Sequence, residues 1–206
     1  MVFSQWIHWA QRLHALAQSG LAYSPAEYDR ERYEMVRKIA SEMLGAASGI
    51  EPPVIDHLFA HEAGYATPKI DIRGVVFRDS KILLVRELAD GGWTLPGGWV
   101  DVNEPPSRAV EREVWEESGY QVRATRLLAV YDRNLHGHLP YIHHIYKLYL
   151  RCELTGGQPT DSHETSGARF FGQDELPPLS LSRTTPEVLA RMFAHFHHPD
   201  WPADFD

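Results

Sequence analysis

Apolar residues near the start of the chain recur every three or four positions, which is the spacing of a helix with one buried face. They are Trp6, Ile7, Ala10, Leu13, Ala17 and Leu21. Gly20 is expected to end this helix, because glycine is common where helices stop. The pattern predicts an amphipathic helix at the start of the chain.

A second helix is predicted to begin at Ser24 and to end near Gly45. Pro25 would occupy its first position, and Glu27 follows Ser24 by three residues, which is the arrangement of a capping box. A third, short helix is expected after Pro52 and Pro53, through Ile55, Leu58 and Phe59. The sequence therefore predicts a small helical domain over residues 1–64.

From residue 65 onward, β-branched and aromatic residues become dense and Gly, Asp and Asn mark turns, which is typical of strands. The predicted strands are 70–77, 82–86, 93–95, 121–131, 143–154 and 168–171. Helices are predicted over 105–118 and 186–197, and Thr184 or Thr185 would cap the second. These elements predict a second domain of mixed α/β type over residues 65–206.

Composition restricts the function classes. The 206 residues carry a formal net charge of -8, which disfavours binding to a nucleic-acid backbone, where a basic surface supplies most of the affinity. DNA is therefore not an expected partner. An anionic substrate would need cations at the site.

The chain has one cysteine, Cys152, in an apolar strand context, where a buried and inert thiol is expected. No apolar run is long enough to cross a membrane, and the first residues lack the features of a signal peptide. These observations predict a cytoplasmic protein with no membrane partner.

The strongest chemical signal is the segment GWVDVNEPPSRAVEREVWEESGY, residues 98–120. Within it, Glu113, Glu116 and Glu117 are spaced so that all three lie on one face of a helix. Like charges at this spacing destabilise a helix, so stability alone does not explain the arrangement. A bound Mg²⁺ removes the repulsion, because hard divalent cations take oxygen ligands and share them with phosphates.

A solvated acidic face paired with Arg108 and Arg112 is the alternative interpretation. The flanking glycines Gly97 and Gly98 argue against it, because they let the backbone approach a ligand closely or turn sharply before the helix.

With Gly98, Glu104, Arg112, the three glutamates and Gly119 in their places, the segment resembles the Nudix box. This resemblance implies a Nudix hydrolase with an α/β/α sandwich around a mixed sheet. It also implies that the ligands of Mg²⁺, or of Mn²⁺, are Glu113, Glu116, Glu117 and the backbone carbonyl of Gly97. Arg112 would orient the carboxylates, and Glu104 would support them.

The implied reaction is attack of a water molecule on one phosphorus of a pyrophosphate, with metal ions neutralising the developing charge. Family members take the general base either from the box or from a later loop. Here Glu164 is the later-loop candidate, and Glu113 and Glu117 are its competitors.

Further candidates to bind the substrate are Arg73 and Arg86 on the first strands and Tyr131 and Arg133 before a histidine-containing loop. Ordinary packing at a strand end is an equally good interpretation of Tyr131 and Arg133. The histidines of that loop are His136, His138, His143 and His144. Their spacing matches no compact zinc pattern, so zinc is not expected.

The N-terminal segment WIHWAQRLHALAQSGLAYSPAEYDRERYE resembles a Nudix subgroup that has a helical domain before the catalytic one. Members of that subgroup are labelled ADP-ribose pyrophosphatases, and some resemble CDP-choline pyrophosphatases. The resemblance favours CDP-choline as substrate, with ADP-ribose as the alternative. A further interpretation treats the helices as a dimerisation element, which would make a homodimer, that also walls off the substrate pocket. A nucleotide-sensing Nudix module without catalysis is the alternative from another class, which the intact carboxylates disfavour.

Overall fold

The computed structural model describes residues 2–59, 62–139 and 141–206. The chain folds into two compact units, residues 1–69 with 140–144 and residues 70–139 with 145–206. The N-terminal unit thus takes in a segment that the sequence placed in the second domain. Ile142 explains this, because it is buried among the side chains of the N-terminal helices.

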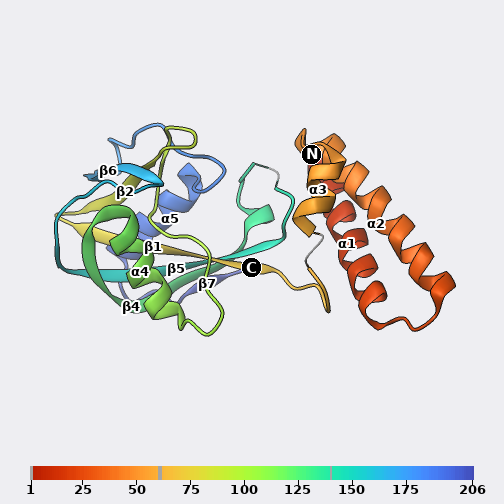
Figure 1. Cartoon of the computed structure of the whole chain (residues 1–206). Helices are drawn as coiled ribbons and strands as arrows, with labels where there is room; N and C mark the ends of the chain where they lie inside the picture. The colour runs from red at the N-terminus through yellow and green to blue at the C-terminus, as the bar shows by residue number, and fades with distance from the viewer. Residues whose placement is uncertain (1, 60–61, 140) are drawn as a thin grey trace. The chain divides into compact units, whose positions relative to one another are not determined.

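In its described residues, the N-terminal unit contains three helices, α1 (Val2–Tyr23), α2 (Glu27–Ser48) and α3 (Pro52–Phe59) (Figure 1). Its core is apolar and small. The buried members are Ile7, Ala10, Leu44, Ile55, Phe59 and Ile142. The predicted third helix is present, and it includes Pro52 and Pro53 instead of following them.

Two details of the predicted helix ends were wrong. Helix α1 continues through Gly20, where a Cβ atom would lie 2.4 Å from the ring of Tyr33. The glycine thus allows close helix packing and does not end the helix. Ser24 does not cap α2, because its amide donates to the carbonyl of Gly20 at 2.8 Å and so belongs to the end of α1. Helix α2 has Ala26 at its N-cap, without a side-chain hydrogen bond.

The second unit is built on one sheet. Among the residues that the structure describes, seven strands pair in the order β3-β2-β1-β5-β4-β7, and β6 pairs with β2. The strands are β1 (Lys69–Arg78), β2 (Lys81–Glu87), β3 (Trp93–Thr94), β4 (Tyr120–Asp132), β5 (Ile145–Gly157), β6 (Thr165–Phe171) and β7 (Asp204–Phe205). The sheet is mixed, since β4 and β7 are parallel and the pair β4 and β5 is antiparallel.

Helices α4 (Pro106–Ser118) and α5 (Pro186–His197) cover opposite faces of this sheet (Figure 1). Alternate strand residues divide between them: Ile72 and Val76 pack with α4, and Val75 packs with α5. Gly74 brings β1 close to α4, because a Cβ there would lie 2.3 Å from Val114. The predicted α/β/α sandwich is confirmed.

Most predicted strands and helices are present with shifted ends. The strand expected from residue 143 begins at Ile145, and the strand expected from residue 168 begins at Thr165. The side chain of Thr185 caps α5 by accepting from the amide of Val188 at 3.3 Å, as one of two predicted caps. Strand β7 was not predicted, because two residues give no periodic signal. No helix in the described part of the chain is long and apolar enough to span a bilayer.

Candidate active site

Helix α4 presents the acidic face that the sequence predicts. Its N-terminus follows the loop through Pro105, whose extended backbone suits the N-cap position, and Gly119 ends it in the left-handed conformation. The three glutamates differ in burial: the side chains of Glu113 and Glu116 are 12% and 46% exposed, whereas Glu117 is buried. The acidic face therefore carries one exposed carboxylate, Glu116, and two that are largely or fully buried, Glu113 and Glu117.

Arg112 binds the neighbouring carboxylates of the same motif. It donates two hydrogen bonds to Glu104, at 2.9 and 2.8 Å, one to Glu113 at 2.9 Å and one to Glu116 at 3.1 Å. The hydrogen bonds to Glu104 are the main reason that the pKa of Arg112 is raised. The bidentate contact fixes the guanidinium plane, and the remaining donors orient two glutamates of the helix. Arg112 therefore contacts the carboxylates that the resemblance expects it to orient.

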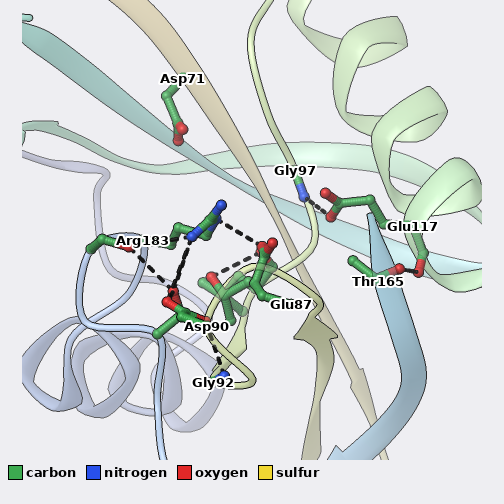
Figure 2. A network of polar contacts seen from close by, with 12 residues as sticks. Asp71, Glu87, Asp90, Gly92, Gly97, Glu117, Thr165 and Arg183 are labelled. Atoms are coloured by element: carbon green, nitrogen blue, oxygen red, sulfur yellow. Dashed lines mark hydrogen bonds and ion pairs between the residues drawn. The ribbon is translucent and has the colours of Figure 1, made fainter. Parts of the chain in front are cut away.

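Glu117 is held from the loop before the helix. The amide of Gly97 donates to its Oε2 atom at 2.8 Å (Figure 2). Burial raises the pKa of Glu117 to about 8, against the opposing influence of Arg73 and of the Gly97 amide. Gly97 has φ 142°, and a Cβ there would lie 2.0 Å from the carbonyl of Ile72, so this close approach requires glycine. The predicted role of its carbonyl as a metal ligand stays a prediction.

The loop before β6, residues 158–164, lies beside the acidic helix. Together they line a cavity of about 270 Å³. The residues that line it are Gly98, Trp99, Asp101, Arg112, Glu113, Glu116, Glu117, Ser162, His163 and Glu164. The cavity therefore brings Glu164, the predicted base, together with the box glutamates. Its carboxylate is 64% exposed and lies 3.3 Å from His163.

The carboxylates suit a hard divalent cation in their chemistry. Carboxylate oxygens are the donors that Mg²⁺ prefers, and burial raises the pKa of Glu113 as well as that of Glu117, so a cation would relieve unfavourable negative charge. In the described part of the chain, no three acidic, histidine or cysteine side chains converge closely enough to hold a metal ion. Arg112 accounts for part of this, since it pairs with Glu113 and Glu116. The residue types fit a cation.

Arg73 lies in the interior, where 5% of the residue is exposed. Its Nε and Nη2 atoms donate to the carboxylate of Asp71 at 2.8 and 2.6 Å, and its Nη1 atom donates to the carbonyl of Leu95 at 3.1 Å. Lys147 Nζ also donates to Asp71 at 2.8 Å, to the same Oδ1 atom that accepts from Arg73 Nε. Arg73 is thus engaged in internal contacts, and its predicted contact with substrate stays a prediction.

The other predicted substrate residues lie apart from the lining of the cavity. Arg86 donates to the carbonyl of Gly91 at 3.1 Å. The hydroxyl of Tyr131 donates to Asp204 at 2.9 Å, and Arg133, which is 3% exposed, donates to the carbonyl of Ser182 at 3.0 Å. Each of these contacts joins the residue to a loop or to the C-terminal segment, and the predicted contacts of these residues with substrate stay a prediction.

The histidines of the loop separate between the two units. His136 stacks on Tyr131, with ring centroids 3.8 Å apart, and pairs with Asp206 at 2.8 Å in the second unit. His143 contacts Phe59 in the N-terminal unit.

Sequence reasoning missed a polar network at the ends of β1, β2 and β5. One group of contacts is that of Asp71 with Arg73 and Lys147, described above, and another is the ion pair of Arg183 with Glu87 at 2.9 Å. Figure 2 shows Arg183 between Glu87 and Asp90. Charged residues inside strands otherwise rich in apolar residues were the available signal for Asp71 and Lys147, since such residues are rarely buried unless paired.

Comparison with known proteins places this site in a family. Residues 68–194 match the model of the NUDIX domain. The chain belongs to the Nudix family. Residues 4–59 match the model described as the UDP-X-like, N-terminal oligomerisation domain. The predicted membership in a Nudix subgroup with an N-terminal helical domain is thereby confirmed, and the chain is a Nudix pyrophosphohydrolase.

Three relatives illustrate the likeness. The putative ADP-ribose pyrophosphatase YjhB of Bacillus subtilis (strain 168) is 46% identical over 205 residues, which cover 100% of this chain and 99% of that protein. The crystal structure of UDP-X diphosphatase has a TM-score of 0.64 at 32% identity and covers 99% of both chains. An ADP-ribose pyrophosphatase structure from Streptococcus suis 89-1591 has a TM-score of 0.63 at 39% identity and covers 68% of this chain and 100% of that one.

Proposed function

We propose that this Nudix chain hydrolyses, with Mg²⁺ or Mn²⁺, the pyrophosphate bond of a nucleoside diphosphate that is linked to another group. The observation that carries the proposal is the cavity in which Glu113, Glu116 and Glu117 lie together with Glu164. A site so rich in carboxylates repels a pyrophosphate unless cations are bound. Nucleotide pyrophosphates bring such cations as their natural counterions.

Glu113, Glu116 and Glu117 would hold the divalent cation, which would neutralise charge developing on the phosphate oxygens during hydrolysis. Arg112 keeps the carboxylates of Glu113 and Glu116 in place through the hydrogen bonds described above. The amide of Gly97 does the same for Glu117. Orientation before binding matters, because side chains that are already ordered lose less entropy when the ligand arrives.

Glu164 would accept a proton from the attacking water. Its carboxylate is exposed, lines the cavity and belongs to a loop whose backbone is hydrogen-bonded. Glu113 and Glu117 are the competing bases. We expect Glu164→Gln to lower kcat by about 10²–10⁴-fold, which is the usual contribution of a positioned base. A loss smaller than about tenfold would assign the base to the box.

Two kinds of resemblance bear on the identity of the substrate. The names of the similar proteins favour ADP-ribose or a UDP-linked compound, whereas the N-terminal sequence resemblance favours CDP-choline. Trp99 is 46% exposed and lines the cavity beside Asp101. An aromatic face next to a carboxylate suits the choline cation, and it also suits stacking on a nucleobase. The shared class is a nucleoside diphosphate with a second group.

A substrate panel tests the proposal. Purified full-length chain is incubated with Mg²⁺ and CDP-choline, ADP-ribose, a UDP-sugar, a diadenosine polyphosphate or a nucleoside triphosphate, and products are separated by chromatography. We expect a nucleoside monophosphate as one product from at least one of the linked diphosphates, and no turnover after chelation. Glu113→Gln and Glu117→Gln should abolish turnover. Glu111→Gln is the matched control, because Glu111 lies on the same helix and bonds the Ala124 amide instead.

The sensing alternative has a distinct outcome. If none of these compounds is hydrolysed although Mg²⁺ binds, the enzymatic proposal is wrong and the nucleotide-sensing alternative is favoured.

The N-terminal unit is proposed to form a homodimer. Helix α2 carries an exposed apolar stripe of Tyr28, Met35 and Ile39, and an oligomerisation domain is the family match of this segment. Large apolar residues that are exposed together on a helix are typical of a contact surface.

A further inference from the structure

The loop that carries Glu164 is attached to the end of helix α4 by two hydrogen bonds. The last carbonyls of a helix have no partner inside it. In this chain, the hydroxyl of Thr165 donates to the carbonyl of Glu117 at 2.6 Å, and the amide of Thr160 donates to the carbonyl of Ser118 at 3.1 Å. The loop therefore satisfies helix groups that would otherwise be buried without a partner.

A second hydroxyl extends this contact to the backbone of Glu164. Ser162 Oγ accepts from the amides of Glu164 at 3.1 Å and Thr165 at 3.0 Å, and it lies 2.9 Å from Thr165 Oγ1. Since Thr165 uses its proton on the Glu117 carbonyl, Ser162 must donate to Thr165. The direction of the two linked hydrogen bonds is thus fixed: Ser162 donates to Thr165, and Thr165 donates to the carbonyl of Glu117. Hydrogen bonds linked in this way polarise and strengthen one another.

The backbone of Glu164 is also held from the opposite side. Its carbonyl accepts from the amide of Leu88 at 2.9 Å. Thr165 itself is completely buried, whereas the Glu164 side chain is exposed and lines the cavity with the box glutamates. Because the backbone of Glu164 is held in place, the positions that its carboxylate can occupy are restricted. Figure 2 shows Thr165 directed at the end of the helix that carries Glu117.

We propose that Thr165 is a positioning residue, whose hydroxyl, bonded to Ser162 and to the Glu117 carbonyl, fixes the Glu164 loop against the acidic helix. The inference rests on the proposed function, in which Glu164 is the base. A hydroxyl at this point links the two parts of the site that come from distant segments of the chain. Misplacement of a reacting group by about 1 Å can cost about 10²-fold in rate.

The test uses the full-length chain and the linked diphosphate that it hydrolyses. Thr165→Val keeps the shape of the side chain and removes the hydroxyl, so we expect kcat to fall roughly 10- to 100-fold while KM changes less than about twofold. Thr165→Ser should restore kcat to within about threefold of the original chain. Thr160→Val is the matched control, because its hydroxyl bonds only Gln158 among the described contacts and its backbone amide is unchanged.

A double-mutant cycle decides whether Thr165 acts through Glu164. Thr165→Val should add less than about twofold to the loss already caused by Glu164→Gln. If the two losses multiply, or if Thr165→Val alone changes kcat less than about twofold, the proposal is overturned. Ser162→Ala is the second variant, for use if Thr165→Val does not fold. It removes the donor to Thr165 and the acceptor of the Glu164 amide, and it should lower kcat with the same dependence on Glu164.

Failure of this inference differs from failure of the proposed function. A chain that hydrolyses no linked diphosphate contradicts the proposed function. A chain that hydrolyses one, yet loses less than about tenfold in kcat on Glu164→Gln, stays a pyrophosphohydrolase and overturns the role of Thr165.

Discussion

Replacing Asp71 with asparagine would remove the carboxylate that bonds two buried cations. Lys147 is 2% exposed and Arg73 is 5% exposed, and both donate to Asp71 at 2.6–2.8 Å. Burial acts to raise the pKa of Asp71, but Arg73 and Lys147 outweigh it and hold that pKa well below its usual range. The folded state therefore depends on a charged carboxylate here.

Removing one partner of a buried ion pair typically costs about 3–5 kcal/mol, because the other charge stays buried. For a chain of this size, that loss lowers the unfolding temperature by about 6–20 °C. Lys147→Met should compensate in the Asp71→Asn background, because it replaces a buried amino group that has lost its carboxylate partner with an apolar side chain. Burial already lowers the pKa of Lys147 to about 7 although Asp71 opposes this. We expect the double variant to regain at least about half of the lost stability.

Differential scanning calorimetry of the full chain measures the unfolding transition of the second unit, residues 70–139 with 145–206. Glu153→Gln is the control: its pair with Arg123 is exposed, so its effect should be below about 1 kcal/mol. Because the pKa of Asp71 is lowered in the folded state, its contribution is present above the unfolded pKa of about 3.9 and is lost as pH falls below it. The gap between the original chain and Asp71→Asn should therefore shrink in acid. A loss below about 1 kcal/mol at neutral pH, or no recovery in the double variant, would refute this reasoning.

Three further predictions address other parts of the chain. Gly97→Ala should destabilise by more than about 1 kcal/mol and lower turnover, since its Cβ would meet a backbone carbonyl. Gly137→Ala also has positive φ but has space around its Cβ, so it should cost less in the same calorimetric comparison. Thr185→Ala removes the cap of α5 and should cost about 1 kcal/mol in chemical denaturation, whereas Thr185→Ser should retain most of it. Met35→Glu should convert the proposed dimer to monomer in sedimentation, whereas Glu34→Gln should leave it unchanged, and a monomeric original chain would contradict the dimer.

The sequence was a good guide wherever the signal was local. Gly20 and Ser24 show its limits even there. The stop signal of Gly20 was overridden by contact with Tyr33 of α2, and Ser24 bonds the end of α1 and does not cap α2. The loop carrying Glu164 could be chosen from the sequence as a candidate, yet its attachment through Thr165 joins residues that are 48 positions apart. No periodic pattern encodes such a contact.

The sequence by itself determined the acidic helix, because the spacing of Glu113, Glu116 and Glu117 places them on one face of any helix they form. Only the tertiary structure decided how these carboxylates differ. Burial and the Gly97 amide act on Glu117, whereas Glu116 stays half-exposed. The structure alone also brought Lys147 to Asp71, 76 positions away, because β1 and β5 are neighbours in the sheet. Charge and spacing are properties of the chain, whereas burial and long-range pairing are properties of its packing.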